Sequence, residues 1–282
     1  MIIFKFAVDV HSKVSDLKQQ KKSIGFVPTM GALHQGHISL IEKSRSTCDL
    51  TISSIFINPT QFNNVDDFNK YPVTIENDIY LLEKNGCDIL FMPDVNEMYP
   101  SGSKTKVHYD LGYLETILEG KFRPGHFQGV CQVVSRLLQI VTPTHLFMGQ
   151  KDYQQCMVIK RLLQLINVNI NLVITPTLRE ENGLAMSSRN IRLTKDEKQQ
   201  ASAIYITLQN IKQNLHPGSI AHLKSQAEEN LITKNFKVDY VEIADADNLM
   251  PVSTWHGDKK LVALIAAFCG DVRLIDNLLL QD

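Results

Sequence analysis

The sequence predicts an α/β fold: a Rossmann-like parallel sheet with helices on both faces, plus a smaller C-terminal α+β domain. Two observations support this prediction. Short apolar runs alternate with longer helix-like segments as far as about residue 176, and such alternation is typical of a parallel sheet covered by helices. Beyond Pro176, helix-like segments come first and strand-like runs follow, which indicates an α+β arrangement. We therefore expect one domain over residues 1–176 and a second over residues 177–282.

Each expected element follows from its apolar pattern. In the first domain, strands are expected at residues 24–28, 51–57, 88–92, 145–148 and 171–175, with helices at 36–47, 74–85, 126–140 and 152–167. In the second domain, helices are expected at residues 195–215 and 220–235, and strands at 237–244, 260–267 and 272–274. Open parallel sheets bind ligands beyond the carboxyl ends of their strands. The loops that follow the strands are therefore the candidate site.

The composition narrows the class of partner. The 282 residues include 29 basic and 30 acidic side chains, for a net charge of -1, whereas binding along a nucleic-acid backbone needs a concentrated basic surface. The five cysteines are dispersed, with no Cys-x-x-Cys pair, which fits free thiols in a reducing compartment. The apolar N-terminal run is too short to span a membrane and lacks a signal-peptide layout. We expect a cytoplasmic protein that binds neither nucleic acid nor membranes.

The loop after the first expected strand has features of a nucleotide site. Gly31 and Gly36 allow close approach of the backbone to a ligand, and a helix that begins near Gly36 would present unpaired N–H groups to a phosphate. His34 and His37 are three residues apart and can stabilise charge on a phosphate. A P-loop is disfavoured because His37 and Ile38 stand where it needs Lys and Ser or Thr. Taken alone, the two histidines also fit a metal site or a buried network.

Polar side chains also follow later strands. Gln61 comes after the second strand, and its amide can donate to and accept from a hydroxylated carboxylic acid. Lys151 follows the fourth strand and can neutralise phosphate charge, while Gln155 lies one helical turn further on. Residues 186–189 supply two hydroxyls and a guanidinium, a suitable set for phosphates. A turn-stabilising Gln61 and a solvated Ser-Ser-Arg turn are the structural alternatives.

Five ordered motifs resemble those of pantothenate synthetases. They are PTMGALHQGH at residues 28–37, NPTQF at 58–62, EGKFRPGHF at 119–127, GQKDYQQ at 149–155 and GLAMSSRN at 183–190. The run RLIDN at residues 273–277 fits as well. The first motif also resembles the His-x-Gly-His of the class I aminoacyl-tRNA synthetase and nucleotidyltransferase superfamily. Five motifs in the same order are far more specific than that tetrapeptide alone.

The resemblance implies a role for individual residues in these motifs. It implies that the catalytic residues are His34, His37, Lys151 and Arg189. The implied ATP-binding residues are Met30, Gly31, His34, His37, Gly149, Gln150, Lys151, Asp152, Leu178, Met186, Ser187, Ser188 and Arg189. The residues implied for pantoate and β-alanine are Met30, Gln61, Arg123 and Gln155. Leu178 stands where the family commonly has valine, and it keeps an apolar contact for the base.

The resemblance further implies an enzyme that uses ATP as co-substrate to join pantoate to β-alanine. It implies a pantoyl-adenylate intermediate, release of AMP and pyrophosphate, Mg²⁺ as cofactor, a homodimer, and a C-terminal domain that closes over the active site. Asp78 is the candidate Mg²⁺ ligand, directly or through water, although its neighbour Asn77 provides no second carboxylate.

Two alternative functions are considered. One is another adenylyl-transferring enzyme of the superfamily, such as a phosphopantetheine adenylyltransferase, whose chains are usually shorter and lack the second and fourth motifs. The other is a non-catalytic nucleotide-binding protein, which would bind ATP without turnover.

Overall fold

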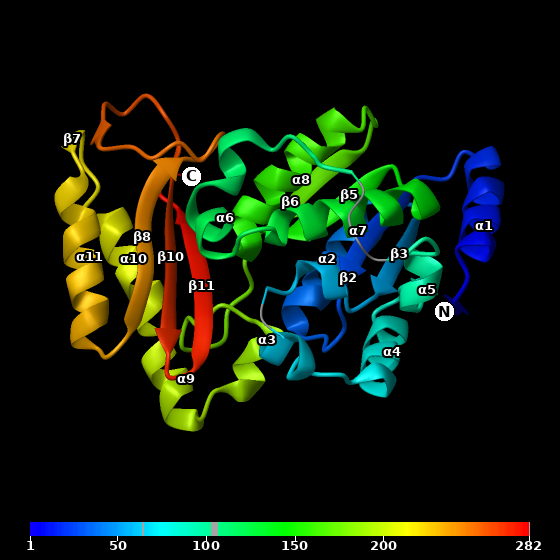
Figure 1. Cartoon of the computed structure of the whole chain (residues 1–282), viewed down its shortest axis with the longest axis horizontal. Helices are drawn as coiled ribbons and strands as arrows, with labels where there is room; N and C mark the ends of the chain where they lie inside the picture. The colour runs from blue at the N-terminus through cyan, green and yellow to red at the C-terminus, as the bar shows by residue number, and fades with distance from the viewer. Residues whose placement is uncertain (64, 103–106, 282) are drawn as a thin grey trace. The chain divides into compact units, whose positions relative to one another are not determined.

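The computed structural model of the chain describes residues 1–63, 65–102 and 107–281. The chain divides into two compact units (Figure 1). The N-terminal unit comprises Met1–Gly149 and Val158–Pro176, and the C-terminal unit comprises Gln150–Met157 and Thr177–Asp282. These units differ from the division expected at residue 176 because the short segment Gln150–Met157 groups with the C-terminal unit. Within the three described stretches, no helix has both the length and the apolar character needed to cross a membrane.

A six-stranded parallel sheet forms the centre of the N-terminal unit, which confirms the predicted fold class. Its order is β1-β4-β3-β2-β5-β6. The strands are β1 (Ile2–Phe4), β2 (Ile24–Thr29), β3 (Leu50–Ile55), β4 (Ile89–Phe91), β5 (His145–Gly149) and β6 (Asn171–Thr175). All five expected strands are present, whereas β1 was not expected. This strand has only three residues at the sheet edge, and Ile2 and Ile3 are exposed, so it lacks the buried apolar run of the other strands.

Helices cover both faces of this sheet. The longer ones are α1 (Ala7–Gln19), α2 (Gln35–Thr47), α4 (Ile75–Lys84), α7 (His126–Val141) and α8 (Tyr153–Leu165). The chain steps from β2 to β3 to β4 in one direction along the sheet and then returns to β5 on the other side of β2. Because parallel crossovers are right-handed, this reversal places the later helices on the opposite face. Accordingly α2 contacts α4, while α1 contacts α7.

The reversal makes the carboxyl end of β2 the switch point of the sheet, where a ligand is expected to bind. β2 lies between β3 and β5, and its residues Ile24, Phe26 and Val27 are fully buried, as expected for a central parallel strand. The shorter helical segments of the unit are η1 (Pro59–Gln61), α3 (Val65–Asn69), α5 (Val95–Met98), η2 (Gly112–Glu115) and α6 (Leu118–Phe122). Among them η1 follows β3 and carries one of the motifs.

The C-terminal unit contains an antiparallel sheet with the order β11-β10-β8. Its elements are η3 (Gln150–Asp152), η4 (Ser188–Arg192), α9 (Lys195–Ala201), α10 (Ala203–Gln213), β7 (Gly218–Ser219), α11 (Ala221–Thr233), β8 (Lys237–Asp245), β9 (Thr254–Trp255), β10 (Leu261–Cys269) and β11 (Val272–Leu279). Helices α10 and α11 pack on the sheet, and the core between them includes Leu208, Leu231 and Ile265, all fully buried. This arrangement confirms the predicted α+β character.

Two elements of this unit differ from expectation. The helix expected over residues 195–215 is divided at Ser202, whose hydroxyl donates to the carbonyl of Gln199 at 2.7 Å and so competes with the main-chain ladder. The strand expected at residues 272–274 extends over Val272–Leu279. Its later residues include Asp276 and Asn277, polar side chains that interrupt the apolar pattern yet are buried.

Candidate active site

The loop that follows β2 is held by a carboxylate on α4. Gly31 and Ala32 have left-handed backbone conformations, with φ of 79° and 49°, and this turns successive N–H groups toward one point. The N–H groups of Ala32 and Leu33 each donate at 2.8 Å to a different carboxylate oxygen of Asp78. Thr74 also donates to that carboxylate, at 3.0 Å. Both oxygens of the buried Asp78 therefore anchor the loop that carries Met30 and Gly31.

The two histidines of the first motif form the start of α2. His34 is the N-cap, and its Nδ1 accepts from the N–H of Gly36 at 3.1 Å. The His37 Nδ1 accepts from the main-chain N–H of His34 at 3.3 Å, which completes a capping box built from two imidazoles. A ring nitrogen that accepts carries no proton, so both rings hold their proton on Nε2. The ring centroids lie 4.1 Å apart. Two Nε2–H donors are thus carried by one rigid helix start.

Gln61 is fixed by contacts at both its amide and its main chain. Its side-chain oxygen accepts from Asn58 Nδ2 at 3.1 Å, and its Nε2 lies 3.1 Å from the sulfur of Met30. Its carbonyl accepts from Nδ1 of the buried His126 at 2.7 Å. Met30 and Gln61, both predicted to bind pantoate, are therefore brought together in the N-terminal unit.

Asn58 is the residue that orients the η1 turn, and it was not predicted. It is 1% exposed. Its oxygen accepts from the main-chain N–H of Thr60 and from the hydroxyl of Tyr99, the latter at 2.8 Å, while its amide donates to the carbonyl of Gly129 as well as to Gln61. Burial raises the pKa of Tyr99 to about 12, so this hydroxyl keeps the proton that it donates. The position of Gln61 thus depends on a buried network.

Arg123 has a partner within its own motif. Its guanidinium lies 3.8 Å from the carboxylate of Glu119, one helical turn earlier, and Glu119 is buried. This pair fixes the end of α6 just before Gly125, which has φ of 78°. The predicted role of Arg123 toward pantoate or β-alanine stays a prediction.

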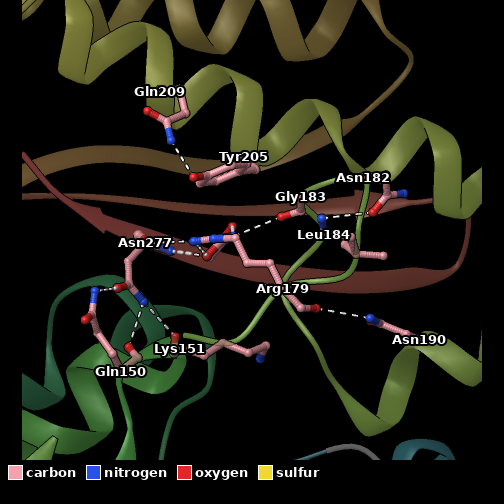
Figure 2. A network of polar contacts seen from close by, with 12 residues as sticks. Gln150, Lys151, Arg179, Asn182, Gly183, Leu184, Asn190, Tyr205, Gln209 and Asn277 are labelled. Atoms are coloured by element: carbon pink, nitrogen blue, oxygen red, sulfur yellow. Dashed lines mark hydrogen bonds and ion pairs between the residues drawn. The ribbon is translucent and has the colours of Figure 1, made fainter. Parts of the chain in front are cut away.

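In the C-terminal unit, Gln150 and Lys151 occupy the short helix η3. The Lys151 ammonium lies 3.9 Å from the carboxylate of Asp152. Asn277 of β11 donates both amide hydrogens to this turn, at 2.9 Å to the Gln150 carbonyl and 2.8 Å to the Lys151 carbonyl. In return Gln150 Nε2 donates to the Asn277 oxygen at 3.2 Å. Figure 2 shows these three residues side by side.

A compact loop carries the other predicted ATP residues of this unit. Arg179 and Ala185 form an isolated antiparallel bridge, and the N–H of Met186 donates to the Leu178 carbonyl at 3.0 Å, so Leu178 and Met186 lie side by side. Leu178 is exposed. Beyond the bridge, Ser187 caps η4 by accepting from the N–H of Arg189. The loop therefore places an apolar side chain and the hydroxyl-rich turn next to each other.

Arg179 connects this loop to β11. Its terminal nitrogens donate to both carboxylate oxygens of Asp276, at 2.6 and 3.0 Å, and its Cζ lies 3.9 Å from the Tyr205 ring centroid. It also donates to the carbonyls of Gly183 and Asn277. Burial raises the pKa of the Asp276 carboxyl above its ordinary value, while the hydrogen bond and charge of Arg179 oppose that rise.

Among the described residues, no group of three or more His, Cys, Asp or Glu side chains is placed to hold a metal ion. Asp78 uses both oxygens on the loop after β2, so its role as a metal ligand stays a prediction. All five cysteines are free thiols. Burial raises the pKa of Cys87 and Cys131 to about 12, which keeps those thiols protonated and weakly nucleophilic.

The predicted residues therefore fall into local groups, several of which are held by residues that were not predicted. Met30 pairs with Gln61, His34 with His37, Lys151 with Asp152, and Leu178 with Met186. Gly149 ends β5, and Gln155 is half-buried on α8. Sequence reasoning missed the supporting residues Asn58, Tyr99, His126, Arg179, Asp276 and Asn277. Four of these, Asn58, His126, Asp276 and Asn277, lie inside recognised motifs, and that was the available signal.

Comparison with known proteins identifies the family. The family model described as pantoate-beta-alanine ligase matches residues 2–279. The pantothenate synthetase of Cytophaga hutchinsonii is 46% identical over 270 residues, covering 95% of each chain. The crystal structure of pantothenate synthetase from Thermus thermophilus superposes with a TM-score of 0.91 at 37% identity, covering 100% of each chain.

A third comparison concerns a liganded structure. The pantoate-beta-alanine ligase of Francisella tularensis, described as complexed with beta-gamma ATP and beta-alanine, has a TM-score of 0.83 and 38% identity, covering 99% of this chain and 98% of the other. The motifs, the fold and the full-length match lead to one conclusion: this chain belongs to the pantoate-beta-alanine ligase family.

Proposed function

We infer that this chain is a ligase that condenses pantoate with β-alanine at the expense of ATP. The observation that carries this conclusion is the family match over residues 2–279. It is supported by a relative of nearly equal length whose structure is described as complexed with beta-gamma ATP and beta-alanine. A second line of support is local. The rigid imidazole pair at the start of α2 and the Met30–Gln61 pair lie in the loops that follow β2 and β3, next to the switch point of the sheet.

The reaction is proposed to run in two steps through a pantoyl-adenylate. A carboxylate oxygen of pantoate attacks the α-phosphorus of ATP, and the bond from that phosphorus to the bridging oxygen breaks, which releases pyrophosphate. The amine of β-alanine then attacks the activated carbonyl carbon. The bond from that carbon to the phosphate oxygen breaks, AMP leaves, and the nitrogen loses a proton. Neither step needs a covalent bond to the protein, so its contribution is positioning and preorganised charge.

The proposed role of each residue follows from where negative charge develops during the reaction. His34 and His37 are neutral donors through Nε2, suited to the oxygens of the α-phosphate as negative charge grows there. Lys151 and Arg189 are cations suited to the departing pyrophosphate, with Arg189 able to form two parallel hydrogen bonds. Gln61 has both a donor and an acceptor for pantoate, and its orientation is fixed by Asn58.

The remaining proposed ligands of ATP and the acids come from the same loops. Leu178 and Met186 provide apolar contacts for the base, and Ser187 and Ser188 provide hydroxyls for the phosphates. Main-chain groups near Gly31, Gly149, Gln150 and Asp152 line the nucleotide. Gln155 and Arg123 are proposed to contact pantoate or β-alanine.

Magnesium is proposed to reach the site with its nucleotide. Mg²⁺ prefers phosphate oxygens, water and one or two carboxylates. Asp78 is committed to two main-chain amides and a hydroxyl, and the residue beside it is Asn77. The donor set therefore does not fit a resident ion, and Mg²⁺ is treated as part of the ATP substrate.

The cellular setting is also a proposal. Five free cysteines favour a reducing compartment, so the enzyme is placed in the cytoplasm, where its product would feed the coenzyme A pathway.

The homodimer implied by the resemblance is tested by sedimentation velocity, where a mass near the 31.9 kDa of one chain would exclude it.

The decisive experiment is ATP–pyrophosphate exchange with magnesium, with and without pantoate, and with β-alanine left out. Reversible adenylate formation predicts exchange only when pantoate is present. Exchange with another acid but not pantoate would identify a different adenylyl-transferring enzyme. ATP binding with no exchange for any acid would indicate a non-catalytic nucleotide-binding protein, and the proposal would be withdrawn.

A further inference from the structure

We propose that Asp276 and Asn277 are positioning residues. They hold the Lys151 turn and the loop carrying Leu178 and Met186 in fixed positions within the C-terminal unit. The inference rests on the proposed function, because it assumes that Lys151 acts on ATP. Neither residue is given a direct contact with substrate. Their effect is on where two ligand-bearing segments of the C-terminal unit lie.

Asn277 is committed to the main chain around Lys151. Its two amide hydrogens go to two consecutive carbonyls, those of Gln150 and Lys151, at 2.9 and 2.8 Å. Its oxygen accepts from the Gln150 amide, and the residue is 1% exposed. Three contacts from one short, buried side chain fix both the place and the rotation of the turn (Figure 2). The position of the Lys151 main chain, from which its side chain extends, is therefore fixed by Asn277 of β11.

Asp276 is committed to the other segment. Its carboxylate accepts two parallel hydrogen bonds from Arg179, the geometry that gives a guanidinium–carboxylate pair its directional specificity. The terminal nitrogens of Arg179 also donate to the carbonyls of Gly183 and Asn277, and its flat face stacks on Tyr205. These four contacts account for the four N–H bonds of the two terminal nitrogens. Arg179 is thereby a brace for the loop and not a phosphate ligand.

The contacts of Asn277 and those of Asp276 are coupled because the two residues are adjacent on β11. The main-chain N–H of Asn277 donates to the Asp276 carboxylate at 2.8 Å, and the Asn277 carbonyl accepts from Arg179 at 3.3 Å. A shift of either segment must therefore disturb the anchor of the other. Three stretches that are distant in sequence, the η3 turn, the Leu178–Met186 loop and β11, share one buried polar network. A network of this kind fixes a single arrangement when every member is satisfied.

A purely structural role is the competing explanation, since a buried ion pair and amide also hold a fold together. The two explanations differ in what happens when Lys151 is already disabled. If Asn277 acts through Lys151, its loss should matter little in a Lys151 variant, because residues that act as a unit are not additive. If Asn277 only supports the fold, its loss should reduce activity by the same factor in either background.

The test is a double-mutant cycle of Asn277→Asp and Lys151→Gln, read by pantoate-dependent ATP–pyrophosphate exchange. Asn277→Asp keeps the shape but removes both donors and sets a negative charge against two carbonyls. We expect kcat/KM for ATP to fall about 100-fold, as misplacement of a reacting group by about 1 Å can do. The matched control is Asn248→Asp, an exposed asparagine of the same unit that retains its acceptor oxygen for Met250, and it should exchange like the wild type. Thermal denaturation of each variant sets a temperature at which all are folded.

The possible outcomes distinguish a failure of this inference from a failure of the proposed function. Support is a Lys151→Gln protein in which adding Asn277→Asp changes exchange by less than about threefold. A further loss of about 100-fold in that background, or an unchanged Asn277→Asp single variant, overturns the inference and leaves the function intact. Wild-type levels of exchange in Lys151→Gln overturn the proposed role of Lys151 and the inference with it. Absence of exchange in the wild-type protein overturns the proposed function itself.

Discussion

The two units support their ligand-bearing loops in different ways. In the N-terminal unit, main-chain groups make most of the anchoring contacts, such as the amides of Ala32 and Leu33 on Asp78 and the amides of the imidazole capping box. In the C-terminal unit, the anchors are side chains on a strand far along the chain, with Asp276 lying 97 residues from Arg179. The first unit thus holds its loops mainly through main-chain amides that donate to carboxylate and imidazole acceptors, and the second holds them through a buried network of side chains on β11. The two should respond differently to substitution.

The largest effect is expected for His37→Ala, which tests the local support. Removing a donor aimed at developing charge costs about 100- to 1,000-fold in turnover, whereas loss of a capping side chain costs only about 1 kcal/mol of stability. Pantoate-dependent exchange and thermal denaturation measure the two. His222→Ala, an exposed histidine on α11, is the control. Turnover close to wild type in His37→Ala would contradict the catalytic assignment.

The next effect concerns the remote network. Arg179→Ala leaves Asp276 as a buried carboxylate without its cation, and breaking such a pair costs about 3–5 kcal/mol. Urea denaturation measures the free energy of unfolding. The double variant Arg179→Met with Asp276→Leu should recover most of this loss, because an apolar replacement removes both charges together. If the single variant lost less than about 1 kcal/mol, the pair would behave like an exposed one, and the contrast between the units would weaken.

A smaller effect is expected at Gly129, where α7 meets the η1 turn. A Cβ there would lie 2.2 Å from the Thr60 carbonyl oxygen and 2.9 Å from the Cα of Gln61. Helix propensity alone would make Gly129→Ala stabilising by about 1 kcal/mol, but overpacking against main chain costs about 1–3 kcal/mol. We expect the clash to dominate, with net destabilisation and a raised KM for pantoate. A rise in thermal stability would show that the turn can move aside.

The smallest effect is a pH dependence in the N-terminal unit. Hydrogen bonds from the Ser23 hydroxyl and N–H lower the pKa of the exposed Asp49 carboxyl from 3.8 to about 2. Because the folded-state pKa is depressed, the stabilisation is present above pH 3.8 and is lost as pH falls toward about 2. Asp49→Asn should therefore differ from wild type at pH 5 and converge with it near pH 2. A constant difference across that range would contradict the linkage.

The same contrast explains what the sequence could predict. The central strands and the helices α2, α4, α7 and α8 were predictable because burial on a parallel sheet demands a regular apolar pattern, as in β2, whereas α1 was not expected. The pairing of His34 with His37 followed from a spacing of three residues. Edge strand β1 was missed because three half-exposed residues carry little pattern. The division of the helix at Ser202 was missed because one hydroxyl decides it.

The residues that support the site were harder to predict from the sequence. Asn58 and Asn277 lie in recognised motifs and Asp78 lies outside them, but in all three cases the sequence does not show whether the carboxylate or amide faces a ligand or the main chain. The sequence makes Asp78 a candidate metal ligand, and in the structure its carboxylate accepts from amides 45 and 46 residues away. Only the fold supplies such partners.

The Asp78 contact also makes the loop after β2 a small anion receptor with its anion built in. Two converging amides at Ala32 and Leu33 hold the carboxylate as they would a free ion. Cutting the side chain back to alanine would leave these two amides without the carboxylate that holds them. Formate is the detached equivalent of the missing group, so the loop of such a variant becomes something that can be chemically rescued. Its order would then depend on the concentration of a salt in the buffer.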